Sequence, residues 1–82
     1  MSTERTVFDQ MIEQTIATDR ALLAALRSQR SMGVNITARA GEAMVRACST
    51  LSYLRERNRS VPKPFLDHMM SQIEALAELA RQ

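Results

Sequence analysis

The stretch VFDQMIEQTIATDRALLAALRSQR, from Val7 to Arg30, decides the fold of this chain. At about 100° per residue, its apolar side chains fall within roughly half a turn of a helix. These side chains are Phe8, Met11, Ile12, Ile16, Leu22, Leu23 and Leu26. Exposing so wide an apolar stripe to water is unfavourable, so we expect two later helices, or a second copy of the chain, to cover it.

The composition predicts one small all-α domain over residues 1–82. Hydrophobic residues make up 45% of the chain and charged residues 24%, which is typical of a globular protein. The chain has only two Gly and two Pro, the residues that most often mark turns, so a small number of long helices is favoured. Because Trp is absent and Phe and Tyr are rare, we expect a core of aliphatic residues and methionine.

Start and stop signals divide the chain into helices over about 4–32, 36–57 and 64–81. Ser2 or Thr3 can cap the first helix, and Gly33 stands where a glycine commonly ends one. The first helix therefore ends near residue 32.

The second and third helices have their own signals. Asn35 or Thr37 can cap the second helix, while Pro62 and Pro64 require it to end before them. Pro64 suits the first position of the third helix. Apolar residues then follow one face of each helix, at Ile36, Ala40, Ala43, Met44, Ala47, Leu51 and Leu54, and at Phe65, Leu66, Met69, Met70, Ile73, Leu76, Ala77 and Ala80. We expect a three-helix bundle, or a helical hairpin plus a third helix, assembled as a homodimer.

Cysteine use and hydropathy favour the cytoplasm. Cys48 is the only cysteine, which rules out a disulfide within the chain and suits a reducing compartment. The opening residues are polar and resemble no signal peptide. No segment approaches the roughly 20 apolar residues that a membrane span needs.

Charge is unevenly distributed along the chain. Residues 1–19 carry a net charge of −3, residues 20–63 carry +7 and residues 64–82 carry −2. The basic middle either receives an acidic partner or is neutralised by the acidic ends when the helices pack.

Asp19 is the candidate buried polar residue, because it lies on the apolar face of the first helix. A buried carboxylate requires a partner, and an arginine of the second helix is the natural one. Asp19 belongs either to a charged pocket between helices, or to a structural ion pair or the edge of the bundle.

A stripe of arginine and tyrosine is the candidate partner-binding surface. Arg39, Arg46 and Tyr53 stand seven residues apart and Arg57 follows one turn later, on the outer side of the second helix. Such a stripe can contact another protein, or stack on a nucleic-acid base. It can also be a solvated face, partly paired with neighbouring glutamates.

Other polar and sulfur-bearing residues suggest no cofactor. Cys48 lies near an apolar face, where we expect a buried and inert thiol. His68 has no second His or Cys at ligand spacing, so no metal site is predicted. The methionines are interpreted mainly as core filler, with a groove for a partner helix as the alternative. No phosphate-binding loop and no paired nucleophile are present in the sequence.

Two segments resemble the small helical chorismate mutases and their isochorismate-pyruvate lyase relatives. Asp19-Arg20-Ala21-Leu22-Leu23-Ala24-Ala25-Leu26, with Arg30, is similar to that family's first helix. Pro64-Phe65-Leu66 and Met69-Met70-Ser71-Gln72-Ile73-Glu74-Ala75 look like its third helix, and together the segments cover about half of the chain. The resemblance implies a three-helix, intertwined dimer and a site that holds a dianionic substrate among arginines and a lysine.

Most positions of that substrate site are not matched. The family's early arginine falls at Ile12 and its later arginine at Gln29 beside Arg30. Its lysine falls at Ala40, or is lost with a connection that is several residues too short. Its acidic residue falls near Met44 or Val45, and its late glutamine at Arg81 beside Gln82. A chain without this clamp can share the fold and lack the activity.

The leading interpretation is a small non-enzymatic helical adaptor or regulator that binds another protein and itself. Its basis is the wide apolar faces, the abundant methionine and the segregated charge. One alternative is a nucleic-acid-binding regulator that uses the Arg39, Arg46, Tyr53 and Arg57 stripe. The other is a chorismate mutase-like enzyme or an inactive relative.

Overall fold

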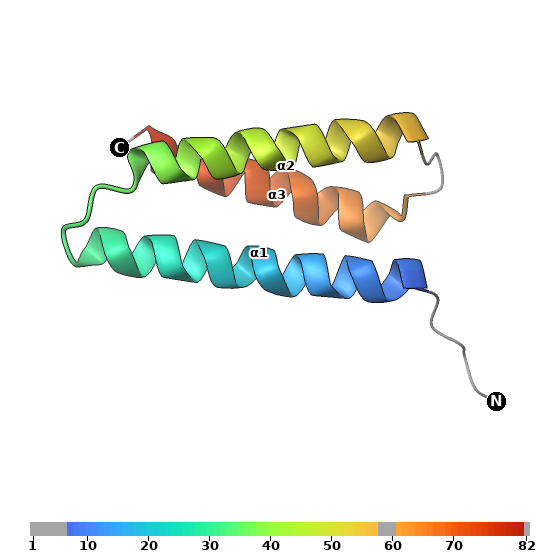
Figure 1. Cartoon of the computed structure of the whole chain (residues 1–82), viewed down its shortest axis with the longest axis horizontal. Coiled ribbons are helices and arrows are strands. Elements are labelled where there is room, and N and C mark those ends of the chain that lie inside the picture. The colour runs from blue at the N-terminus through green and yellow to red at the C-terminus, as the bar shows by residue number, and fades with distance from the viewer. Residues whose placement is uncertain (1–6, 58–60, 82) are drawn as a thin grey trace.

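The chain forms three α-helices in a computed structural model that describes residues 7–57 and 61–81. Helix α1 spans Val7–Ser31, α2 spans Thr37–Arg57 and α3 spans Lys63–Ala80 (Figure 1). No strand occurs in these ranges, so the predicted all-α fold class is confirmed. The expected caps Ser2 and Thr3, and the expected start of the first helix at residue 4, lie outside the described residues.

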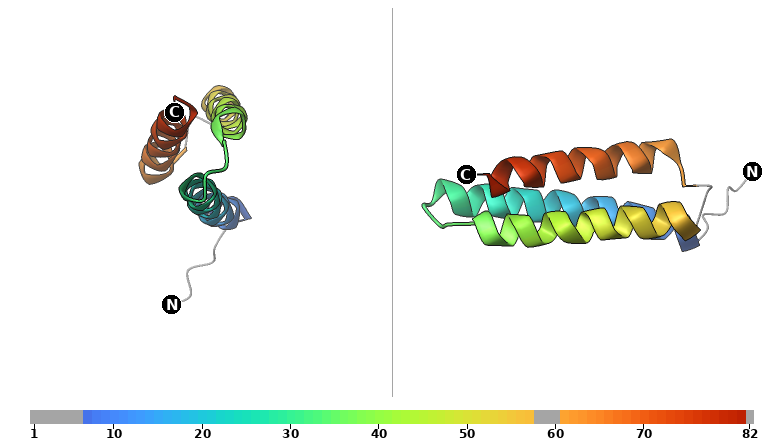
Figure 2. Two further views of the ribbon diagram at one scale, coloured as in Figure 1. Left: turned by 90° about the vertical axis from the view of Figure 1, so that its left-hand side faces the viewer. Right: turned by 90° about the horizontal axis from the view of Figure 1, so that it is seen from above.

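The three helices lie side by side in an elongated body of 50 × 28 × 15 Å. Helices α1 and α3 run in the same direction and α2 runs against them (Figure 1). Seen end-on, they occupy the corners of a triangle (Figure 2). Helix α2 packs closely on α3, whereas α1 packs mainly on α3 and contacts α2 much less.

Gly33 ends α1, as its position predicts. Its φ of 85° is in the left-handed region, which glycine enters without steric cost. The amide of Gly33 donates to the carbonyl of Arg30 at 2.9 Å, and the amide of Val34 donates to the carbonyl of Gln29 at 2.9 Å. This pair of bonds is a Schellman motif, which satisfies carbonyls that the helix end leaves open.

Asn35 and Pro62 set the starts of the two later helices. Asn35 Oδ1 accepts a hydrogen bond from the amide of Thr37 at 3.1 Å, as expected of a helix cap. Pro62 is extended, with φ −62° and ψ 140°, and α3 begins at Lys63, one residue before its expected start. Pro64 fits there because the first-turn amides of a helix have no intrahelical acceptor, so the missing N–H of proline costs no hydrogen bond.

Among residues 7–57 and 61–81, the core consists of two apolar clusters, one toward each end of the helices. One cluster contains Leu26, Ile36, Ala40, Leu76 and Leu79. The other contains Leu51, Phe65 and Met69, with Ile12 and Ile16 of α1 packed against it. Helix α1 supplies one fully buried residue, Leu26, because only α3 approaches it closely.

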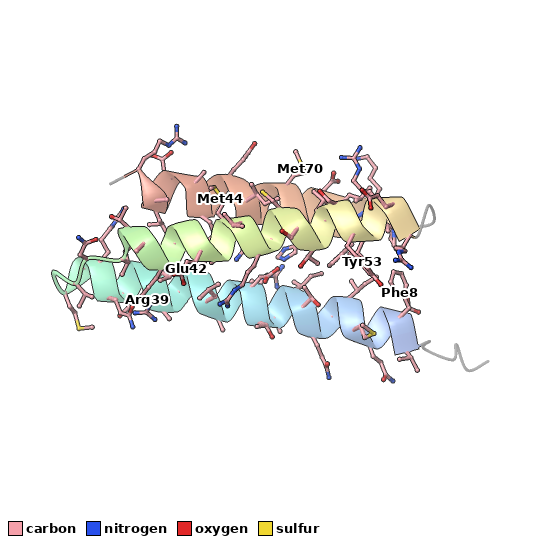
Figure 3. The ribbon with its side chains drawn as sticks, turned by 45° about the horizontal axis from the view of Figure 1, so that its top comes forward. Phe8, Arg39, Glu42, Met44, Tyr53 and Met70 are labelled. Carbon is pink, nitrogen blue, oxygen red and sulfur yellow. The ribbon has the colours of Figure 1, made fainter. Side chains whose placement is uncertain are left out.

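Several burial expectations are corrected by this arrangement. Cys48 is exposed, although its place near an apolar face led us to expect a buried thiol. The buried stripe of α2 is narrow because α3 is the only helix that packs closely on it. Among the methionines, Met69 is buried, whereas Met11, Met32 and Met70 are exposed and Met70 points outward from α3 (Figure 3).

Candidate functional site

Three polar side chains meet between α1 and α3. Nε2 of His68 lies 2.8 Å from Oδ2 of Asp19, and Nε2 of Gln72 donates to the backbone carbonyl of Asp19 at 3.1 Å. The Asp19 side chain is 21% exposed and that of His68 is 14% exposed, while Gln72 is 3% exposed. We call Asp19, His68 and Gln72 the polar layer.

Helical spacing places the polar layer in the core. Along α1, Asp19 follows Ile16 by three residues and precedes Leu23 by four. Along α3, Gln72 follows Met69 by three residues and precedes Leu76 by four. Residues at this alternation of three and four share one helix face, so both polar residues lie on the apolar stripes of their helices.

The polar layer lies between the centres of the two apolar clusters along α1 and α3. Leu26 and Leu76 lie on one side of it, and Ile16 and Met69 lie on the other. Sliding α1 along α3 would leave a buried carboxylate, imidazole or amide without its partner, and each such loss costs about 1–3 kcal/mol. The layer therefore fixes the alignment of α1 on α3, in the way that single core polar residues fix register in coiled coils.

The partner of Asp19 differs from the expected one. We expected an arginine of the second helix, but Asp19 pairs with His68 of α3. The reason is geometric, since α1 lies against α3 and meets α2 much less. Asp19 is half-buried, as a residue at the edge of the core.

His68 is held on two sides. Its ring stacks near that of Phe65, with centroids 6.3 Å apart and an interplanar angle of 27°. No Ser, Thr or Cys of the described residues bonds to it, so the histidine and aspartate lack a paired nucleophile there. Residues 7–57 and 61–81 also contain no group of three or more His, Cys, Asp or Glu residues that could hold a metal ion.

A cavity of about 250 Å³ opens beside the polar layer. All three helices line it, and α3 provides Gln72, Met69 and Leu76. Its polar lining is Thr15, Thr18 and Asp19 from α1, Arg46 and Thr50 from α2, and Gln72 from α3. The cavity exists because α1 leans on α3 and leaves the seam between α1 and α2 incompletely filled.

The arginine and tyrosine stripe borders the same seam. Arg39, Arg46, Tyr53 and Arg57 are all exposed, and Figure 3 shows Arg39 near the beginning of α2 and Tyr53 toward its end. Nη1 of Arg39 donates to Oε1 of Gln29 on α1 at 2.5 Å, so the stripe lies on the edge of α2 near α1 and is not on an outer side remote from it.

Two of the three stripe arginines are engaged within the chain. The guanidinium carbon of Arg57 stands 5.3 Å from the centre of the Tyr53 ring, a cation–π contact that covers one side of the ring. Arg39 is bonded to Gln29. Arg46 lines the cavity and makes no hydrogen bond or ion pair with the residues that the structure describes.

Sequence reasoning missed Gln72 and Leu79 as buried residues. Both lie in the series Phe65, Met69, Gln72, Leu76 and Leu79, whose spacing alternates between four and three. That alternation is the signal that could have found them. Gln72 was overlooked because its amide is polar, and its acceptor on Asp19 is 53 positions away in the sequence.

Comparison with known proteins gives no match: no family model matches the chain, no curated protein matches it, and no solved structure matches it. Within the described ranges, none of the three helices has the length and apolar character to cross a membrane.

Proposed function

We propose that this chain is a small non-enzymatic helical adaptor or regulator that acts by binding another protein, and that it works as a homodimer of three-helix bundles. One observation carries the proposal. The widest apolar face of the sequence, on α1, is only partly covered by α2 and α3. Of its seven apolar residues, Leu26 is buried, Met11 is exposed, and Phe8, Ile12, Ile16, Leu22 and Leu23 are half-buried.

A second copy of the chain is the proposed cover for α1. The helix begins with the acidic residues Asp9 and Glu13 and ends with the basic residues Arg27 and Arg30. Two α1 helices that pair antiparallel across a two-fold axis would set the acidic half of each beside the basic half of the other. This self-complementary charge favours an isologous interface, and burial of the α1 face contributes about 25 cal/mol per Å².

The arginine stripe of α2 is the proposed surface for the other protein. Arg46 is the arginine of the stripe that makes no bond among the described residues, so it is available to an acidic group of a partner. Tyr53 is 58% exposed, with the Arg57 guanidinium over its ring, and offers an aromatic contact to a partner. Arginine and tyrosine are common among the residues that dominate protein interfaces. The proposed setting is the cytoplasm, where an exposed thiol such as Cys48 stays reduced.

The homodimer is tested by sedimentation equilibrium. The expected mass is twice the 9.2 kDa of one chain. Met11→Glu should give monomers, while Val45→Glu, a control on α2 with nearly equal exposure, should remain dimeric. Circular dichroism must show equal helicity for both variants. A wild-type chain that sediments at the monomer mass contradicts the homodimer.

The binding function is tested by a tagged pull-down from nuclease-treated host lysate, followed by purification of the recovered protein. We expect one stoichiometric protein whose affinity falls at least about tenfold with Arg46→Glu, the equivalent of about 1.4 kcal/mol. Arg55→Glu makes the same charge change at another exposed position of α2, and should leave the affinity unchanged. Partners that disappear with nuclease would favour the nucleic-acid alternative. Loss of chorismate absorbance on adding the chain would favour the enzyme.

A further inference from the structure

The cavity between the three helices contains hydrogen-bond acceptors with no donor. Nε2 of Gln72 is used by the Asp19 carbonyl, and no described residue donates to Oε1 of Gln72. No fully buried side-chain oxygen or nitrogen of the described residues lacks a partner, so this oxygen is not fully buried, and Gln72 lines the cavity. Asp19, on the same wall, gives Oδ2 to His68 and leaves Oδ1 without a donor among the described residues.

The positive charge of the cavity, opposite to that of Asp19, comes from α2. Arg46 lines the cavity from that helix and has no partner among the described residues. Thr50, one turn further along α2, also lines the cavity. The cavity therefore has acceptors on its α1 and α3 side, and a cationic donor on its α2 side.

The rest of the lining is apolar. Leu22, Ala43, Ala47, Met69 and Leu76 complete the wall. Pockets for drug-sized ligands measure about 300–1,000 Å³, so a cavity of about 250 Å³ admits a smaller molecule. A ligand with a single charge would meet a like charge on one wall, Asp19 for an anion and Arg46 for a cation, whereas a ligand with both charges complements both walls.

We infer that this cavity is a binding site for a small zwitterion with an apolar body, namely an α-amino acid with an apolar side chain. Its ammonium group donates to Asp19 Oδ1 and Gln72 Oε1, and its carboxylate accepts from Arg46. Its side chain packs among Leu22, Met69 and Leu76. The bound molecule joins α1 to α2, which is the pair of helices with the least contact.

His68 provides a reporter for binding, because it is the only histidine of the chain and is bonded to Asp19. The experiment follows its ring proton signals by NMR while the full chain is titrated with L-leucine, L-methionine or L-phenylalanine. We expect a saturable shift with at least one of these, with a dissociation constant of about 1 mM or lower. Isocaproate lacks the ammonium group of leucine and isoamylamine lacks its carboxylate, so both should bind at least about tenfold more weakly.

Arg46→Gln is the decisive variant, because Arg46 is exposed and its loss removes no hydrogen bond or ion pair among the described residues. It should weaken binding at least about tenfold, whereas Arg55→Gln, at an exposed α2 position outside the cavity, should not change it. The inference is overturned by any one of three results: no saturable shift up to about 10 mM of the three amino acids, equal binding of either analogue, or an unchanged dissociation constant in Arg46→Gln.

Discussion

Asp19 of α1 and His68 of α3 face each other across the core, with Oδ2 and Nε2 2.8 Å apart and 49 positions between them in the sequence. The neighbouring Gln72 bonds to the backbone of the same aspartate. Asp19 thus anchors α1, which has a single fully buried residue, to the tightly packed pair of α2 and α3. The polar layer sets the alignment of α1, while part of the apolar face of this helix stays open to another molecule.

The first prediction concerns the strength of this anchor. Asp19→Ala and His68→Ala should each destabilise the chain, and a double-mutant cycle should give a coupling energy of about 1–3 kcal/mol, because both side chains are mostly buried. The measurement is urea unfolding followed by circular dichroism. The control pair is Lys63 and Asp67, 3.0 Å apart and both largely exposed, whose coupling should stay below about 0.5 kcal/mol. Equal coupling in the two pairs would contradict the anchor.

The polar layer also shows what the sequence could and could not predict. The three helices follow from apolar periodicity, and the end of α1 follows from Gly33, because both depend on residues close together in the chain. The partner of Asp19 depends on which helix approaches α1, and periodicity does not contain that information. The bond of His68 to Asp19 could therefore not be foreseen.

Exposure on α2 illustrates the same limit. Cys48 lies one position beyond Ala47, which packs in both core clusters, and a shift of about 100° moves it out of the contact with α3. The sequence shows where an apolar face lies. The width of its buried part depends on how many helices pack on it, and that is a property of the assembled fold.

The second prediction compares the two glycines. Gly33→Ala should destabilise the chain by about 1 kcal/mol, because an L residue at φ 85° is strained even though the space beside Gly33 is open. Gly41→Ala should instead stabilise it by up to about 1 kcal/mol, since Gly41 is inside α2 and nothing lies within 4 Å of the added Cβ. Thermal unfolding of both variants checks the opposite signs. A stabilising Gly33→Ala would be incompatible with the left-handed end of α1.

The third prediction concerns the thiol. Cys48 is exposed, so it should react completely with Ellman's reagent in the folded chain. The rate should match that of the urea-unfolded chain to within about a factor of ten, because no unfolding step has to precede the reaction. Cys48→Ser serves as the blank. A thiol that reacts only after urea is added would show that this side of α2 is covered in solution.

The fourth prediction uses two adjacent methionines of α3 as a matched pair. Met69 is 2% exposed and packs with Leu51 and Phe65, whereas Met70 is 53% exposed. Met69→Ala should lower the free energy of unfolding by about 2–5 kcal/mol, because it removes buried methylene groups and leaves a cavity. Met70→Ala removes the same atoms from the surface and should change it by no more than about 0.5 kcal/mol. Urea unfolding of both variants at equal chain concentration gives the two values. If Met70→Ala costs as much as Met69→Ala, then the outer side of α3 is buried in solution, and a second interface must be added to the one proposed on α1.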